Sequence, residues 1–311
     1  MIDIQKIVVY TSIIGGIDAL KEDQVASSLA FHAFVDGDVT SSIWTIHKAN
    51  GIFKDPRRTA RMYKILAHQL FPDAEFTVWV DGTISVTRSL IPLIEEFASS
   101  GKDLATFRHP ERDCLYAEAD VCKRLRLDDF ASIDGQVAAY RACGFPEHLG
   151  LYESSVIIRR NTARVSAFND RWWSDLCTHS RRDQLSMPFA LHATGLSVYE
   201  LPGNPQNIPK IHPNRTGSIY FSWTDHASQA HYGATEKSPT DADAPAPSSD
   251  KDVRASYAIS KTGARIYVDI SDRRGQTLID KRGNFNPNSL LLWEYLVQSR
   301  AWPSIIDIGA N

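Results

Sequence analysis

The stretch FTVWVDG, residues 76–82, is an apolar run that stops at an acidic residue and a glycine. Unbroken β-branched and aromatic residues are typical of a strand that is buried on both faces of a parallel sheet. The run therefore predicts a strand that delivers Asp81 at its C-terminal end. Ligands bind at that edge of open α/β sheets, so Asp81 is a candidate binding residue. Taken alone, however, Asp81-Gly82 favours a simple turn.

Composition limits the class of protein. The 311 residues are 43% hydrophobic and 23% charged, as in a globular protein with one large domain or two smaller ones. The net charge of -3 provides no basic field for nucleic acid. No apolar run approaches the ~18 residues that span a bilayer, and the N-terminus lacks a signal-peptide pattern. Scattered cysteines without a CxxC pair indicate reduced thiols. We expect a cytoplasmic protein, or one at the inner face of the membrane.

Apolar runs alternate with helical patterns over the first two thirds of the chain. Strands are expected at residues 4–10, 30–35, 42–47, 76–82, 103–108, 153–159 and 196–200. Helices are expected from about residue 55 and at 88–99, 116–126, 134–143, 163–177 and 181–194. This alternation predicts an α/β domain with a mixed, mainly parallel sheet flanked by helices.

A segment rich in Pro, Ala, Ser and Asp, residues 237–252, has nothing that could pack a core and predicts a linker. We therefore expect a first domain over residues 1–235, a linker over 236–252 and a second α/β domain over 253–311. The second domain is expected to be truncated, because the chain stops where a strand runs into Asp-x-Gly at Asp307.

A basic helix is predicted after Asp55. Arg58, Arg61 and Lys64 follow one another at a spacing of three and share one face. Three cations on one stripe repel one another by roughly a few tenths of a kcal/mol per pair unless an anion neutralises them. Either a bound phosphate or a merely solvated face is consistent with the stripe.

Several sequence islands, in order, resemble the TOD1/MUCI70 glycosyltransferase-like family. They are YTSIIGGID (10–18), FVD (34–36), DPRRTAR..K (55–64), VWVDG (78–82), HPERDCLYAEA (109–119), GFPEHLGLYE (144–153) and RWW…RRDQLS (171–186). The resemblance implies a GT-A-like fold, a nucleotide-sugar donor, expected to be UDP-linked, and a divalent metal, Mn²⁺ or Mg²⁺. It implies that Asp81 is the remaining carboxylate of a DxD-type metal site. His212 is then the candidate for a second metal ligand, and Lys210 for a contact to the diphosphate.

The resemblance also implies roles around the donor. Arg58, Arg61 and Lys64 are assigned to the nucleotide or diphosphate. The base and ribose pocket is assigned to the first two strands and the turn between them, with Tyr10, Thr11, Asp18 and Asp36. His109 and Arg112 are assigned to the sugar pocket, with a structural loop in which Arg112 pairs with Glu118 or Asp113 as the alternative.

Asp183 is the candidate catalytic carboxylate, between Arg182 and Gln184 at the start of a helix. A group that deprotonates an acceptor hydroxyl, or that stabilises an oxocarbenium-like centre, is expected at such a place. A helix-capping role suits the position equally well.

The last residues, IIDIGAN (305–311), resemble the start of an FkbM-type methyltransferase domain, so S-adenosylmethionine is expected only in a complete parent protein. We therefore expect a glycosyltransferase for a glycan acceptor, in bacterial surface polysaccharide synthesis, with peripheral association with a membrane glycan assembly. The alternatives are a metal-dependent hydrolase acting on a lipid or glycan, and a non-catalytic glycan-binding module.

Overall fold

The computed structural model describes residues 2–26, 28–204, 217–224, 255–259 and 265–269. The chain forms two compact units, Met1–Lys237 and Ser238–Asn311. In the second unit, strands β10 (Ala255–Ile259) and β11 (Arg265–Asp269) pair antiparallel. Among the described residues, no helix combines the length and apolarity that crossing a bilayer requires.

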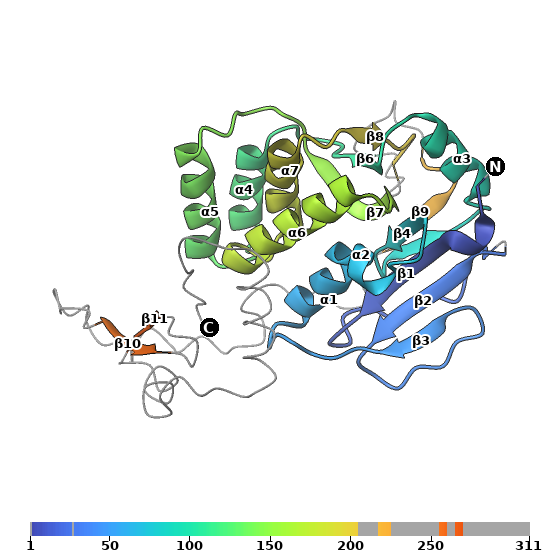
Figure 1. Cartoon of the computed structure of the whole chain (residues 1–311), viewed down its shortest axis with the longest axis horizontal. Coiled ribbons are helices and arrows are strands. Elements are labelled where there is room, and N and C mark those ends of the chain that lie inside the picture. Colours follow the sequence, from blue (N-terminus) through green and yellow to red (C-terminus); the bar gives the residue numbers. More distant parts are fainter. Residues whose placement is uncertain (1, 27, 205–216, 225–254, 260–264, 270–311) are drawn as a thin grey trace. The chain divides into compact units, whose positions relative to one another are not determined.

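The first unit is built on a seven-stranded sheet in the order β3-β2-β1-β4-β7-β6-β8 (Figure 1). Its strands are β1 (Ile7–Ile13), β2 (Ala30–Val35), β3 (Thr45–Lys48), β4 (Phe76–Val80), β6 (Leu104–Arg108), β7 (Tyr152–Arg160) and β8 (Val198–Glu200). Strand β7 runs antiparallel to both its neighbours, and all other pairs are parallel. The predicted α/β class with a mixed, mainly parallel sheet is confirmed.

Helices cover both faces of the sheet (Figure 1). They are α1 (Pro56–Ile65), α2 (Ala67–Leu70), α3 (Ile91–Ser99), α4 (Leu115–Arg124), α5 (Phe130–Ala142), α6 (Ala163–Thr178) and α7 (Asp183–Thr194). Helix α3 packs on one face, against Phe76, Val78 and Val80 of β4. Helices α1, α6 and α7 pack on the other face, against Trp79. Every residue of β4 is buried, as the apolar run predicted.

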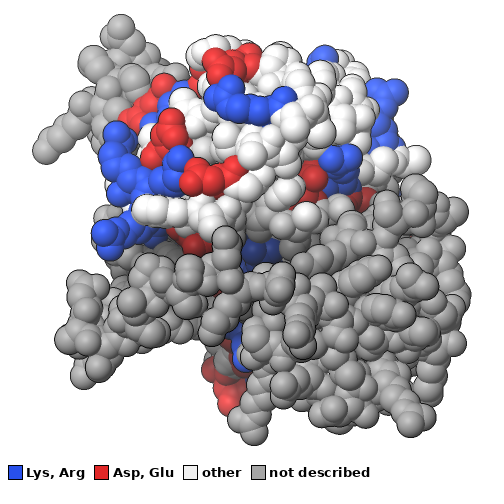
Figure 2. All heavy atoms as spheres, turned by 90° about the vertical axis from the view of Figure 1, so that its left-hand side faces the viewer, with Lys and Arg blue, Asp and Glu red and all other residues white. Residues whose placement is uncertain are grey.

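Helices α4 and α5 form an outer layer against α7. On the described part of the face in Figure 2, basic and acidic side chains are interleaved. Lys123 on α4 lies 3.3 Å from Asp120 of the same helix and 2.8 Å from Asp134 on α5. Exposed pairs of this kind contribute roughly 0–1 kcal/mol each, so the layer is held mainly by its apolar contacts.

Some element boundaries differ from the predictions because of local caps and short pairings. Strand β1 begins three residues late, because Asp3 accepts a hydrogen bond from the Gln5 N–H and starts a 3₁₀ turn, η1 (Ile4–Lys6). Helix α5 begins early, because the Asp129 side chain caps it at Ser132. A second small sheet, β5 (Ile84–Val86) with β9 (Phe221–Trp223), was missed, because three-residue strands show no periodicity.

The direction of β7 determines where the functional residues meet. Strands β1, β2 and β4 end at the edge where the antiparallel β7 begins. The residue after β4 is therefore beside the start of β7, and the Asp81 N–H donates to the Ser155 carbonyl at 2.8 Å. This edge is the one that the apolar run indicated.

The turn after β1 depends on glycine. Gly15 has φ +72°, and an added Cβ would lie 2.6 Å from Pro56 Cβ at the start of α1. Gly16 has φ +62°, with nothing within 4 Å of such a Cβ. We expect Gly16→Ala to cost about 1 kcal/mol of unfolding free energy through its left-handed backbone alone. Gly15→Ala is expected to cost about 2–4 kcal/mol, because overpacking adds to that strain. Urea unfolding of both variants measures the difference, and equal costs would contradict the Gly15–Pro56 packing.

Candidate functional site

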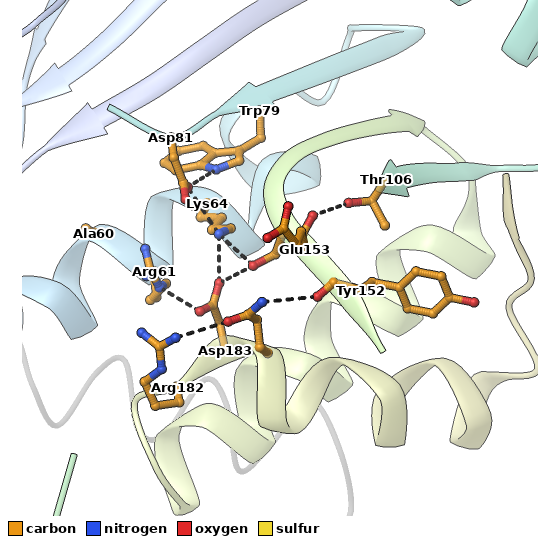
Figure 3. A network of polar contacts seen from close by, with 12 residues as sticks. Ala60, Arg61, Lys64, Trp79, Asp81, Thr106, Tyr152, Glu153, Arg182 and Asp183 are labelled. Atoms are coloured by element: carbon orange, nitrogen blue, oxygen red, sulfur yellow. Dashed lines mark hydrogen bonds and ion pairs between the residues drawn. The ribbon is translucent and has the colours of Figure 1, made fainter. Parts of the chain in front are cut away.

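The side chain of Lys64 lies at the centre of a polar network at this edge of the sheet (Figure 3). Its Nζ lies 2.7 Å from Asp183 Oδ2, 3.1 Å from Asp81 Oδ1 and 2.9 Å from Ser154 Oγ. Only 1% of the side chain is exposed. An ammonium group has three N–H donors, and three oxygen acceptors lie within hydrogen-bonding distance. In this conformation Lys64 therefore binds protein groups and has no donor left for a ligand.

Four elements deliver the network. Lys64 comes from α1, and Asp81 is the first residue after β4. Ser154 lies near the start of β7, and Asp183 is the first residue of α7. Elements distant in sequence are thus joined through one buried cation. Burial lowers the pKa of Lys64, and the charges of the two carboxylates offset part of that effect.

Asp183 is the most strongly perturbed acid of the network. It is 2% exposed, and its oxygens contact Lys64, Ser154 and Arg61. Burial alone would raise the pKa of Asp183, but the positive charges of Arg61, Lys64 and Arg182 outweigh burial and hold the pKa far below its usual range. A buried carboxylate with so low a proton affinity is a poor general base. These surroundings argue against direct proton transfer by Asp183 and for a positioning role.

Asp183 is not a helix cap either. The N-cap residue of α7 is Arg182, and it makes no side-chain capping bond. The Asp183 carboxylate is turned toward α1 and β7 instead. Its backbone carbonyl accepts a hydrogen bond from Trp172 Nε1 at 2.9 Å. The acid is thus held from both its side chain and its main chain.

Asp81 is the more accessible acid, with 24% of its side chain exposed. Its Oδ1 accepts hydrogen bonds from Trp79 Nε1 at 2.6 Å and from Lys64. Gly82 follows it, and a Cβ there would lie 3.2 Å from Asp18 Cβ, which places the Asp18 side chain beside the end of β4. The structure thus brings together the predicted residues Asp18 and Asp81.

The predicted basic stripe of α1 is divided between two tasks. Arg61 Nε lies 3.1 Å from Asp183 Oδ1, and 21% of the Arg61 side chain is exposed. Arg58 instead donates to the carbonyls of Leu176, Cys177 (3.3 Å) and His179 (2.9 Å) at the end of α6. The Arg58 guanidinium thus satisfies helix-terminal carbonyls, and its assignment to a diphosphate stays a prediction.

More arginines gather where α1 meets α7. Arg182 Nη2 donates to Gln184 Oε1 at 3.0 Å, and Gln184 Nε2 donates to the Tyr152 carbonyl at 3.4 Å. Burial lowers the pKa of the neighbouring residue Arg57, and so do three cations near it: Arg181, Arg182 and Arg61. Crowded cations of this kind favour the binding of an anion.

Sequence reasoning missed Arg57, Trp79 and Ser154. Arg57 stands in the same basic segment as Arg58, so composition pointed to it, but the helical spacing favoured its neighbour. Trp79 was assigned to a buried strand, which is correct, yet its indole N–H also orients Asp81. Ser154 carries no signal in the sequence, since a serine at the start of a strand is unremarkable.

The first strand supports the network from beneath rather than lining a pocket. Tyr10 is 0% exposed, and its hydroxyl donates to the Lys64 carbonyl at 2.9 Å and accepts from Arg159 Nη1 at 3.0 Å. The assignment of Tyr10 to the base or ribose pocket is corrected accordingly. Thr11 is also buried. Asp36 accepts from the Gly15 N–H at 2.8 Å and so fixes the turn after β1.

Tyr10→Phe tests this supporting role. Loss of the hydroxyl leaves the buried Arg159 Nη1 without its acceptor, so we expect the free energy of unfolding to fall by about 1–3 kcal/mol. Tyr199→Phe is the matched control, because the Tyr199 hydroxyl donates to Glu96 at 2.6 Å on the surface. Chemical unfolding and nucleotide titration check both variants. A large loss of nucleotide affinity in a stable Tyr10→Phe protein would return Tyr10 to the binding site.

The loop after β6 has a structural arrangement. His109 Nδ1 accepts from the Glu111 and Arg112 N–H groups, each at 3.1 Å. Arg112 Nε donates to the buried Glu118 Oε2 at 2.6 Å. This is the alternative pairing considered from the sequence, and the assignment of His109 and Arg112 to a sugar pocket stays a prediction.

A family model described as "TOD1/MUCI70, glycosyltransferase-like domain" matches residues 22–197, which is more than half of the chain. The chain belongs to this family. Two Arabidopsis thaliana relatives are similar. "Probable hexosyltransferase MUCI70" is 27% identical over 175 residues, 53% of this chain and 30% of the relative. "Alkaline ceramidase TOD1" is 25% identical over 187 residues, 54% of this chain and 40% of the relative. The chain thus spans well under half the length of either.

Solved structures with a related arrangement include three glycosyltransferases. Mouse xyloside xylosyltransferase 1 has a TM-score of 0.40 at 10% identity, covering 71% of this chain and 97% of that chain. The bifunctional glycosyltransferase WbbM has a TM-score of 0.39 at 13% identity, covering 63% of this chain and 38% of that chain. A glycosyltransferase involved in the glycosylation of the major capsid of PBCV-1 has a TM-score of 0.37 at 10% identity, covering 73% of this chain and 96% of that chain. Family membership rests on the sequence match over residues 22–197.

The described donor set does not fit a divalent cation. Asp81 Oδ1 already accepts from Lys64 and from Trp79, and a metal bound there would lie close to an ammonium group. The described residues contain no group of three or more His, Cys, Asp or Glu that could hold a metal. His212 and Lys210, the other two predicted contacts, lie outside the described residues.

Proposed function

We propose that this domain transfers a sugar from a nucleotide-sugar donor, expected to be UDP-linked, to a glycan acceptor. The observation that carries the proposal is the set of fixed cations, Arg61, Lys64 and Arg182, around Asp183 at the sheet edge where ligands bind. Membership of a glycosyltransferase-like family supports the same reaction class.

When the bond between the sugar and a nucleoside diphosphate breaks, negative charge develops on the diphosphate leaving group. Cations that are already oriented stabilise this charge more in the transition state than in the ground state. We take Arg61 as the ligand-facing member, since its Nε lies 3.1 Å from Asp183 Oδ1 while 21% of its side chain is exposed. Asp183 holds Arg61 in place and is itself held by Lys64, and Arg182 adds positive charge from α7.

Asp81 is the acid that a substrate can reach. Its accessible side chain, anchored by Trp79, is placed to accept a hydrogen bond from a sugar hydroxyl. Asp18, beside Gly82, is the second acid near that position. We propose contacts to the donor sugar for both residues, and a positioning role for Asp183.

The wider setting that we propose is the synthesis of a bacterial surface polysaccharide, in a parent protein that also carries a sugar methyltransferase. The resemblance of residues 305–311 to an FkbM-type opening supports the second activity. In that parent protein, one arm would add a sugar and the other would methylate the glycan.

Nucleotide release tests the proposal. The protein is incubated with a panel of UDP- and GDP-sugars, with and without Mn²⁺, and free nucleotide is measured. We expect release from one donor class above the level of a boiled control, and a strong loss in Asp81→Ala. Failure to bind or cleave any nucleotide-sugar would overturn the proposal and would favour a non-catalytic glycan-binding module.

Hydrolysis of a lipid is the second candidate, because one relative is named an alkaline ceramidase. Activation of water by a metal in such a hydrolase needs a site with several protein ligands. The described residues provide no such group. Release of fatty acid from ceramide by the same preparation, without cleavage of nucleotide-sugars, would favour this candidate.

A further inference from the structure

We infer that the Lys64 ammonium occupies the place of a divalent cation in this site, so that the donor diphosphate binds without a metal. The inference rests on the proposed function, because it concerns how that donor is held. It replaces the Mn²⁺ or Mg²⁺ expected from the family resemblance with a cation supplied by the chain itself.

The first argument is the set of oxygens around Nζ. Two carboxylates, Asp81 and Asp183, and one hydroxyl, Ser154, lie 2.7 to 3.1 Å from a single nitrogen. Carboxylate and hydroxyl oxygens from separate elements are the kind of ligand set that a hard cation gathers. Here the ammonium occupies the centre, with each of its three donors directed to one oxygen.

The second argument is electrostatic repulsion. A divalent cation bound to Asp81 would be held near the Lys64 ammonium, and that ammonium is 1% exposed. Water screens charges poorly in such a buried position, so the two cations would repel each other strongly. The Trp79 Nε1–H, 2.6 Å from Asp81 Oδ1, also directs a positive hydrogen at the oxygen that the metal would need.

The third argument is that the chain supplies phosphate-binding groups of its own. Arg61 reaches the site with its Nε on Asp183 and with exposed surface remaining. Guanidinium groups bind phosphate oxygens with paired N–H donors and remain charged at any physiological pH. Arginines of α1 and α7 therefore take over the neutralisation of the diphosphate that a metal would otherwise provide.

Nucleotide binding to the wild-type protein provides the first test. The affinity for the nucleoside diphosphate of the preferred donor is measured by calorimetry in EDTA and in millimolar Mn²⁺. We expect the two dissociation constants to agree within about 3-fold. A loss of 10-fold or more in EDTA would overturn the inference and leave the proposed function intact. Absence of binding in both buffers would overturn both.

A gain of metal binding provides the second test. Lys64→Ala removes the ammonium and leaves two carboxylates and a hydroxyl around a vacated position. We expect millimolar Mn²⁺ to raise the melting temperature of Lys64→Ala by about 2 °C or more. Neither the wild type nor Lys48→Ala should respond, since Lys48 lies at an exposed site, where it pairs with Asp38 and donates to the Asp36 carbonyl. An equal rise in the wild type would overturn the inference, and this arm remains decisive if Lys64→Ala does not fold.

Discussion

Replacing Lys64 with methionine is expected to lower the free energy of unfolding by about 3–5 kcal/mol. Methionine has a similar length but no charge, so packing changes little while the cation is lost. Asp183, 2% exposed, would then lose one cation and one hydrogen bond in a buried position. The cost arises because the buried Asp183 carboxylate keeps only Arg61 and Ser154 as partners and must stay charged with less compensation or take up a proton. Urea or thermal unfolding measures the change.

A double-mutant cycle separates this coupling from packing. Lys64→Met combined with Asp183→Asn removes both charges, and we expect the double variant to be more stable than the sum of the single changes predicts. Lys48→Met is the surface control; its pair with Asp38 spans 3.6 Å between largely exposed side chains, so about 0–1 kcal/mol is expected. A cost below about 1 kcal/mol for Lys64→Met would mean that the network contributes little to folding.

Arg61→Ala is expected to reduce kcat/KM for the nucleotide-sugar by about 10²–10³-fold. The guanidinium faces the proposed diphosphate, where negative charge grows as the glycosidic bond breaks. Nucleotide affinity should fall less, by about 10–100-fold, because the product makes only part of the interactions of the transition state. Arg61→Lys should recover part of the loss, since it restores the charge but not the paired donors.

Arg58→Ala is the matched control, one helical turn earlier on α1. Its guanidinium bonds to the carbonyls at the end of α6, so we expect a loss of about 1–2 kcal/mol in stability and a change in kcat/KM of no more than a few-fold. Steady-state kinetics and unfolding of both variants decide the matter. If Arg58→Ala lost activity and Arg61→Ala kept it, the division of the basic stripe would be wrong.

The fold could be predicted from the sequence because the patterns that indicate its strands and helices are local. The buried run of β4 and the amphipathic pattern of α6 each depend on residues that are neighbours in the chain. The boundaries that failed, at β1 and α5, failed where one aspartate side chain caps a turn. Such caps depend on a rotamer and a backbone angle, which periodicity does not reveal.

The candidate site could be predicted from the sequence only in part, because its chemistry depends on residues that are neighbours only in the folded chain. Spacing put Arg58, Arg61 and Lys64 on one face correctly, but only the position of α6 shows that Arg58 is used elsewhere. Asp183, Asp81 and Lys64 were each identified, but nothing in the sequence showed that Lys64 pairs with both carboxylates. Burial also changes the role of Asp183, since a carboxylate among cations no longer behaves as an exposed one.

The reversed direction of β7 has a consequence for how such a domain can diversify. Backbone pairing of β4 with β7 sets Asp81 beside Ser154 regardless of the chain between them. That intervening chain holds β5, α3, β6, α4 and α5. Insertions or deletions there would therefore leave the pairing of β4 with β7, and the short distance between Asp81 and Ser154, in place.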